Sequence, residues 1–438
     1  MSDTPEAPTL FQAFAYWLKL GFISFGGPAG QIALMHTDLV ERKRWISERR
    51  FLHALNYCMV LPGPEAIQLA IYISWLLHGI VGAVMAGVLF FLPAFLILSG
   101  LAWAYLEWGH LPVVQGLFYG IKPAVVAVVL FAAWRIGLRV LNNPLLWAVA
   151  ISSLVAMLLG IGFPWIVLAA ALVGVLVGHY KPNYFQASAS HAQSTRSYGK
   201  AVIDDDTPTP QHAQFSWSKL IITLVAFFLI WAGVLWLIAG QPTLQTMGVF
   251  FTKAAFLTIG GAYAVLPYVS EAAVKTYAWL TAPQMMDGLA LGESTPGPLI
   301  MIVTWVGYMG GVAKDVVVNP VLAGLLGASV ATFFTFLPSF MFIIAGAPIV
   351  ESTRDSLKLA APLTAITAAV VGVIVNLALF FAYHTFWQVT PASSFLSRVD
   401  WFAIALALAA FIALWKYKRD VMLVLAASAL MGLAAFML

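Results

Sequence analysis

The stretch Ser24-Phe25-Gly26-Gly27 interrupts an apolar segment near the start of the chain, and Thr258-Ile259-Gly260-Gly261 repeats it in the second half. A second interruption, Pro62-Gly63-Pro64, recurs at the same offset as Pro296-Gly297-Pro298, with no gap between the pairs. Duplicated units with Gly and Pro breaks inside apolar segments are typical of secondary transporters, because such breaks expose helix ends at a site within the membrane. The pattern therefore indicates a transporter.

The composition places most of the surface in lipid. Of the 438 residues, 62% are hydrophobic and only 9% are charged, whereas about 25% are charged in ordinary soluble domains. So few charges cannot cover a surface that faces water. Stretches such as Ile80–Leu106 and Val113–Trp134 are long enough to span a bilayer. We expect an all-α, polytopic membrane protein whose surface mostly faces the lipid bilayer.

Composition also argues against several other classes of protein. The single cysteine, Cys58, excludes an internal disulfide and a thiolate metal cluster, and the histidines lack metal-ligand spacing. No Walker A sequence and no haem, flavin or cluster motif occurs, so we expect no metal, no cofactor and no enzymatic activity. The net charge of +4 comes from basic residues in short loops between apolar spans. These residues are topology signals, and nucleic acid is not an expected partner.

The repeats divide the chain into four expected parts. A first repeat covers residues 10–180, and a second repeat covers residues 244–438. Residues 181–216 are rich in Ser, Gln, His and Pro and predict a solvated, disordered cytoplasmic linker. Residues 217–240 predict a linking transmembrane helix that belongs to neither repeat.

Charge asymmetry predicts that the two repeats are inserted in opposite directions. The loop Glu41–Arg50 carries five basic residues, whereas its counterpart, Glu271–Asp287, carries only Lys275. Positive loops stay in the cytoplasm, so the two loops should lie on opposite sides of the membrane. A single crossing at Trp217–Gly240 would supply this inversion. We therefore expect inverted-topology repeats.

The first two apolar segments of each repeat are interrupted. In the first repeat, Leu10–Val40 breaks at its Gly-Gly-Pro, and Phe51–Leu77 breaks at its Pro-Gly-Pro. Unpaired backbone at membrane depth is tolerated only where it is buried in protein or lines a wet cavity, so the four breaks must face each other. Kinked spanning helices and re-entrant hairpins both stay open. The later spans should be unbroken helices: Ile80–Leu106, Val113–Trp134, Leu145–Leu159 and Gly162–Gly178, with counterparts Val321–Ala345, Leu359–Phe381, Trp401–Trp415 and Val421–Leu438.

The breaks are the candidate substrate site. A helix that restarts after a break presents free N–H groups and the positive end of its dipole, which together form a cradle for an oxyanion. The hydroxyl of Ser24 or Thr258 could donate a further hydrogen bond. The alternative is that Gly and Pro only permit tight helix packing. The residues assigned to the cradle are Ser24, Gly26, Gly27, Pro62 and Gly63 in the first repeat and Thr258, Gly260, Gly261, Pro296 and Gly297 in the second.

Two lysines match between the repeats. Lys19 and Lys253 each lie in an apolar segment about two helical turns before the Gly-Gly break. An ammonium near the bilayer interior costs at least a few kcal/mol, so the pair predicts neutralisation of an anionic substrate. The alternative is that both side chains snorkel toward the interface.

Two carboxylates flank the Pro-Gly-Pro breaks without matching. Glu65 follows the first break, where the second repeat has Leu299, and Glu293 precedes the second break, where the first repeat has Met59. Proton coupling and pairing with a cation or a helix N-terminus both stay open as roles.

Other polar residues predict structural roles. We expect Gln31 and Gln68 to pack against neighbouring helices, and we interpret Arg135 and Arg139 as a cytoplasmic topology signal.

Five stretches of the chain carry a recognisable pattern: Phe22–Ala33 (FISFGGPAGQIA), Arg44–Glu48 (RWISE), Asn56–Ala66 (NYCMVLPGPEA), Leu257–Pro267 (LTIGGAYAVLP) and Gly292–Leu299 (GESTPGPL). These motifs resemble the chromate ion transporter family, in its long-chain, two-domain form. The resemblance covers nearly the whole chain. It implies a bacterial inner-membrane protein that exports chromate and so confers chromate resistance, with the similar dianion sulfate as a competitor.

The resemblance does not settle which oxyanion this chain prefers. A carrier for sulfate or another tetrahedral oxyanion such as molybdate would share every feature above, and a membrane redox enzyme is a further, weaker alternative. The sequence leaves the oligomeric state open, a homo-oligomer included.

Overall fold

The computed structural model describes residues 5–24, 27–180, 198–259, 261–352, 360–387 and 399–438. Every regular element in these ranges is a helix, and strand-like pairing is limited to isolated bridges. The all-α class predicted from the sequence is therefore confirmed. Six of the described helices are long and apolar enough to cross a membrane: α4 (Glu65–Trp108), α5 (Pro112–Val140), α7 (Phe163–Tyr180), α8 (Trp217–Leu237), α13 (Pro320–Ser352) and α14 (Ala360–Phe386).

The remaining helices complete two similar series. The first repeat adds α1 (Leu10–Ile23), α2 (Gly27–His36), a π-helix η1 (Thr37–Arg42), α3 (Glu48–Val60) and α6 (Pro144–Leu158). The second adds α9 (Pro242–Leu257), α10 (Ala262–Glu271), a π-helix η5 (Ala272–Thr276), α11 (Ala282–Ser294), a 3₁₀ turn η6 (Leu299–Met301), α12 (Ile302–Ala313), α15 (Trp401–Trp415) and α16 (Val421–Met437).

Backbone details repeat at the offset seen in the sequence. A π-helix follows the second helix of each repeat, as η1 in the first and η5 in the second. After each π-helix the chain turns back in the same way, with Trp45 N–H donating to Leu39 C=O and Trp279 N–H donating to Ala273 C=O, both over 2.8 Å. The residue before each tryptophan has a left-handed backbone, with φ of 50° and 48°. The duplication is therefore conformational as well as compositional.

Both kinds of break require glycine. Gly27 and Gly261 have φ of +74° and +99°, and Gly63 and Gly297 have φ of +124° and +106°. Residues with a Cβ are strained in this left-handed region, because the Cβ approaches backbone oxygens. The breaks fall where the sequence predicts them, and α1, α3, α9 and α11 end at them.

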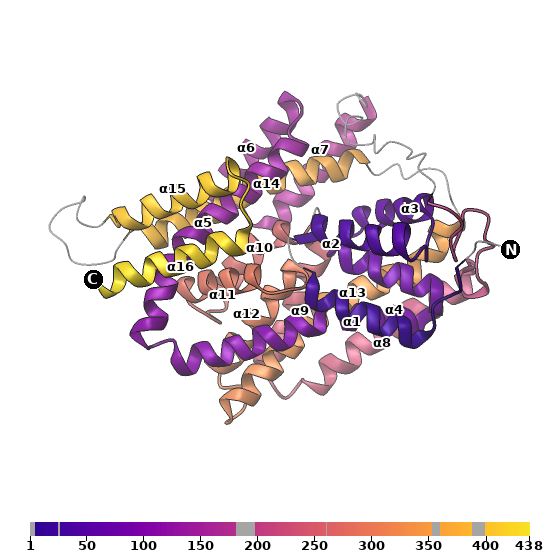
Figure 1. Cartoon of the computed structure of the whole chain (residues 1–438), viewed down its shortest axis with the longest axis horizontal. Helices are drawn as coiled ribbons and strands as arrows, with labels where there is room; N and C mark the ends of the chain where they lie inside the picture. Colours follow the sequence, from indigo (N-terminus) through magenta and orange to yellow (C-terminus); the bar gives the residue numbers. More distant parts are fainter. Residues whose placement is uncertain (1–4, 25–26, 181–197, 260, 353–359, 388–398) are drawn as a thin grey trace.

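The long helices of the two repeats are interleaved. Helix α5 of the first repeat packs against α15 and α16 of the second, and α14 of the second packs against α6 and α7 of the first. Helices α5 and α14 also pack on each other. Figure 1 shows α5 lying with α15 and α16 at the end of the molecule near the C-terminus. Each repeat therefore needs the other to cover its apolar helices.

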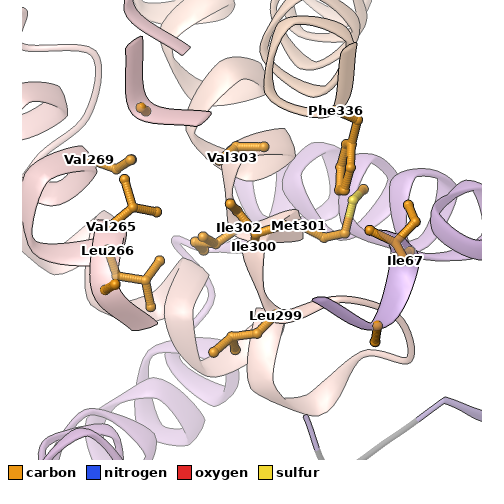
Figure 2. Packing of buried hydrophobic residues seen from close by; sticks show 14 of the residues in the cluster. Ile67, Val265, Leu266, Val269, Leu299, Ile300, Met301, Ile302, Val303 and Phe336 are labelled. Carbon is orange, nitrogen blue, oxygen red and sulfur yellow. The ribbon is translucent and has the colours of Figure 1, made fainter. Parts of the chain in front are cut away.

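The segment that follows the second Pro-Gly-Pro lies in the apolar core. Figure 2 shows Leu299–Val303 between Val265, Leu266 and Val269 of α10 on one side and Ile67 of α4 on the other. All of these side chains are buried. The break is thus held in place by packing on both sides.

Helix α8 lies outside this interleaved arrangement. It has no buried residue and packs on α13, and the Trp231 indole N–H donates to Thr252 Oγ1 of α9 over 3.0 Å. Its length and apolar surface match those expected of a linking transmembrane helix. The inverted insertion of the two repeats stays a prediction.

The prediction of a disordered linker is wrong for residues 198–216, and residues 181–197 lie outside the described ranges. Ile203 pairs with the loop after η1, because its N–H donates to Trp45 C=O and its C=O accepts from Ser47 N–H. Ser47 Oγ donates to Asp205 over 2.6 Å, and Arg50 donates to Thr207 C=O over 2.7 Å. The polar groups of this segment thus hold it against the first repeat, because the basic loop supplies hydrogen-bond partners for its carboxylates and carbonyls.

Helices α5 and α16 touch backbone to backbone. A Cβ added to Gly120 would lie 1.9 Å from Ser428 O, and one added to Gly432 would lie 2.1 Å from Gly120 N. Small residues at a crossing are how helices associate tightly inside a membrane.

We expect Gly120→Ala to lower the thermal unfolding temperature of the detergent-solubilised protein. The added methyl must push α5 and α16 apart, and overpacking of this kind costs about 1–3 kcal/mol. The matched control is Gly100→Ala in α4, where an added Cβ has no atom within 4 Å. Equal unfolding temperatures for the two variants would contradict the close crossing.

Candidate functional site

Each break contacts a break of the other repeat. The Gly63 N–H donates to Thr258 C=O over 2.6 Å, and the Gly297 N–H donates to Ser24 C=O over 2.8 Å. Gly63 and Gly297 are counterparts, as are Ser24 and Thr258, so the two contacts are reciprocal. Reciprocity of this kind is the mark of a two-fold relation between the contacting units. The expectation that the breaks face one another across the repeats is borne out.

The hydroxyls at the breaks already have acceptors. Ser24 Oγ donates to Leu20 C=O, and Thr258 Oγ1 donates to Ala254 C=O, each one turn back in its own helix. Both residues are almost fully buried. The predicted hydrogen bond from these hydroxyls to an anion is therefore not supported by the geometry.

Two glutamines stabilise the breaks directly. Gln31 Nε2 donates to Gly297 C=O over 2.7 Å and reaches Ser24 C=O at 3.4 Å, so one amide joins both repeats. Gln68 Nε2 donates to Pro62 C=O over 2.7 Å. The glutamines therefore do more than pack against neighbouring helices, because their amides hydrogen-bond to the backbone of the breaks. The second repeat has Val265 and Ile302 at the equivalent positions, so the amide contacts are not duplicated.

Ion pairs anchor the short helices α3 and α11 to the opposite repeat. Arg50 of α3 lies 3.6 Å from Glu351 of α13, and both side chains are buried. Lys122 of α5 lies 3.6 Å from buried Asp287 of α11, which also accepts a 2.9 Å hydrogen bond from Tyr105 Oη. Each helix that leads into a Pro-Gly-Pro break is therefore tied across the repeat interface.

A cavity of about 70 Å³ lies at one pair of breaks. Gly27 at the start of α2 and Gly297 in the second Pro-Gly-Pro both line it, together with Thr295. About 10–15 Å³ of such space accommodates one water molecule, so this cavity can hold a small polyatomic anion. Its other lining residues come from α5, α10, α11, α16 and the segments beside them: Val128, Phe131, Ala132, Arg135, Tyr263, Gly292, Glu293, Leu299, Asp420, Val421 and Met422.

Arg135, Tyr263 and Glu293 line the cavity together with the polar side chains of Thr295 and Asp420. Tyr263 Oη donates to Glu293 Oε1 over 2.6 Å. Arg135 lines the same cavity, and both the arginine and the glutamate are partly buried. Within the part of the chain that the structure describes, Arg135 makes no hydrogen bond or ion pair. Its guanidinium thus borders the cavity with its donors unused.

The other predicted break residues have varied positions. Gly63 and Pro296 are buried, whereas Pro62 and Gly261 are partly exposed, and Gly26 and Gly260 lie outside the described residues. Glu65 is partly buried at the start of α4, and no described residue hydrogen-bonds or ion-pairs with it. Of the two predicted carboxylates, Glu293 lines the cavity and Glu65 does not.

The structure does not bring the two lysines to the cavity. Lys19 on α1 and Lys253 on α9 are both exposed, and neither lines the cavity at the breaks. Their role as charge-neutralising groups stays a prediction that this geometry does not support.

Two functional candidates were not predicted from the sequence. Arg135 lies within α5, in an apolar stretch, and that position inside a spanning-length helix was the available signal. Tyr263 gave no comparable signal, because a tyrosine beside a break is also typical of ordinary helix packing. Only the fold shows that α5 and α10 meet α11 at Glu293.

Comparison with known proteins adds independent evidence. The sequence model of the chromate transporter family matches residues 11–175 and 245–433, which lie in the two repeats. A chromate transport protein of Cupriavidus metallidurans is 32% identical over 99% of this chain and 95% of that protein. One from Pseudomonas aeruginosa is 33% identical over 97% of this chain and 92% of that protein.

A third relative is more distant. A probable chromate transport protein of Synechococcus elongatus is 29% identical over 84% of this chain and 83% of that protein. No solved structure matches the chain. Because the family match spans both repeats and the relatives align over nearly their full length, this chain belongs to the chromate transporter family, as a multi-pass membrane protein of the long-chain form.

Proposed function

We propose that this protein is a secondary transporter that exports chromate across the bacterial inner membrane and thereby confers chromate resistance. Family membership and relatives named as chromate transport proteins support chromate as the substrate. The observation that carries the proposal is the reciprocal pairing of Gly63 with Thr258 and of Gly297 with Ser24, beside a cavity that Gly27 and Gly297 line. Sulfate, a dianion of the same shape, is the expected competitor.

The anion is bound at the start of α2. The first N–H groups of a helix have no partner within that helix, and the helix dipole is positive there. Gly27 begins this ten-residue helix and has no side chain to hold a ligand away from the backbone. Oxyanions bind at helix N-termini for these reasons.

Export needs no fuel beyond the membrane potential. Moving one charge through 100 mV is worth ~2.3 kcal/mol, so a dianion that leaves a negative-inside cell gains ~5 kcal/mol per 100 mV. The two repeats rock about the paired breaks to expose the cavity to each side in turn. The reciprocal glycine contacts support this mechanism, since they can serve as a common pivot for both repeats.

Purified protein in liposomes should carry radiolabelled chromate at a rate that rises with the imposed potential, with no pH gradient present. The potential acts directly on the two negative charges of the substrate. Protein-free liposomes give the background, and excess sulfate should lower the rate. A flux that is indifferent to potential would remove the electrogenic mechanism, and absence of any flux would remove the transport function.

Replacing Gly27 with Ala should reduce chromate transport by about tenfold, equivalent to ~1.4 kcal/mol. The methyl group would stand between the anion and the N–H groups of α2. The matched control is Gly160→Ala between α6 and α7. Its φ of +83° is close to the +74° of Gly27, and neither added Cβ meets an atom within 4 Å. Both variants should lose similar stability, about 1–2 kcal/mol, but only Gly27→Ala should lose transport. Equal transport by both variants would exclude the start of α2 as the binding site.

The predicted role of Lys19 and Lys253 in neutralising the anion is tested in cells. If it holds, Lys19→Ala and Lys253→Ala each reduce chromate tolerance when expression matches the wild type. Wild-type tolerance in both variants would refute the role and would agree with the exposed positions of the two side chains.

A further inference from the structure

We propose that Arg135 binds the transported oxyanion directly. The negative carboxylate of Glu293 opposes binding of that oxyanion in the same cavity, so Glu293 takes up a proton when the substrate binds. The inference rests on the proposed function and names the chemistry of its site.

The unused donors of Arg135 are the first argument. A partly buried guanidinium loses hydration, and this loss is costly unless acceptors replace the water. No described residue supplies such an acceptor to Arg135, although Glu293 lines the same cavity. The guanidinium presents donors in a planar fork, which matches two oxygens of a tetrahedral oxyanion. The missing acceptor is thus supplied by the substrate.

The position of Arg135 is the second argument. It lines the same cavity as Gly27, where α2 begins, so the guanidinium and the helix N-terminus face one small volume. An anion of tetrahedral shape can accept from both groups at once. Arg139 lies one turn further along α5 and is exposed, so the neighbouring arginine does not share this environment.

The carboxylate of Glu293 is the third argument. It accepts from Tyr263 Oη and lies on the cavity wall, where a negative charge would repel a dianion. The other charged group on that wall, Asp420, is exposed and caps α16 by accepting from Met422 N–H over 2.8 Å. Asp287, which lies nearer the start of α11, pairs with Lys122 of α5. Neutralising Glu293 is therefore the change that makes the cavity favourable for an anion.

Proton and anion binding are consequently linked. Protonation of Glu293 leaves Arg135 as the dominant charge on the wall, so anion affinity rises as pH falls through the titration of this carboxyl. By the same linkage, bound anion favours uptake of a proton. A proton released together with the dianion reduces the exported charge from two to one, and the potential still drives export. Tyr263 can remain hydrogen-bonded to Glu293 in both protonation states.

The site is present once in each chain. The positions equivalent to Tyr263 and Glu293 in the first repeat are Ala29 and Met59, and the position equivalent to Leu299 is Glu65. Among the described residues, the cavity beside the second Pro-Gly-Pro is therefore the place where this tyrosine and glutamate lie together with Arg135. One anion is bound per chain.

The test measures chromate and sulfate binding to the detergent-solubilised full-length protein, together with liposome flux. Arg135→Gln should weaken binding of both anions by about tenfold or more, because a hydrogen-bonded charge is lost. Arg135→Lys should restore part of the affinity. Arg139→Gln is the matched control and should bind as the wild type does.

The role of Glu293 is tested by repeating the measurement between about pH 6 and 8. Wild-type affinity should rise as pH falls, whereas Glu293→Gln should bind tightly throughout. Comparing the two proteins at each pH cancels any change in the protonation of chromate itself. A pH dependence that is equal in Glu293→Gln and the wild type would overturn the linkage.

The outcomes separate the two proposals. Wild-type protein that binds and carries chromate, with Arg135→Gln and Arg135→Lys equally active, would overturn this inference and leave the proposed function intact. Wild-type protein that binds sulfate through Arg135 but not chromate would support the site and refute the substrate. Thermal unfolding of each variant distinguishes a lost ligand contact from a lost fold, and binding by folded Arg135→Lys decides the case if Arg135→Gln does not fold.

Discussion

The structure depends on one constraint, which is that backbone polar groups inside a membrane must find partners within the protein. Each repeat breaks two helices and so frees N–H and C=O groups in an apolar surrounding, where an unpaired group costs several kcal/mol. The reciprocal hydrogen bonds of Gly63 with Thr258 and of Gly297 with Ser24 satisfy part of this requirement. Neither repeat can do so alone, because each glycine N–H uses a carbonyl of the other repeat.

The same constraint explains why the repeats are interleaved instead of packed as two separate bundles. Helix α5 packs against α15 and α16, and α14 packs against α6 and α7, so the long helices of each repeat are covered by helices of the other. Glycine crossings such as Gly120 with Gly432 bring these helices into backbone contact. The anchoring pairs Arg50–Glu351 and Lys122–Asp287 then fix α3 and α11, which lead into the Pro-Gly-Pro breaks. Each helix that leads into a Pro-Gly-Pro break is therefore tied to the opposite repeat.

The two repeats share their backbone conformation at the breaks, but several polar side chains at the breaks and the cavity differ between them. Backbone conformations agree closely between the repeats, as the paired φ values at Gly27 and Gly261 show. Polar side chains do not agree. Gln31 and Gln68 join the breaks only from the first repeat, and Tyr263 and Glu293 occur only in the second. Because these polar residues occur in only one repeat, a single small anion site can form where the two similar repeats meet.

The sequence alone determined the all-α membrane class, the duplicated motifs and the positions of the breaks, because hydrophobic length and Gly/Pro punctuation act locally. It also identified Gly27, Gly297 and Glu293, which border the cavity. It could not decide that Lys19 and Lys253 face outward, since an apolar stretch does not fix which side of a helix meets the partner repeat. Nor could it decide that residues 198–216 dock on the first repeat, or that Arg135 and Glu293 line one cavity, because both depend on how segments distant in sequence are arranged. Which helix faces which is set by packing, and packing exists only in the tertiary structure.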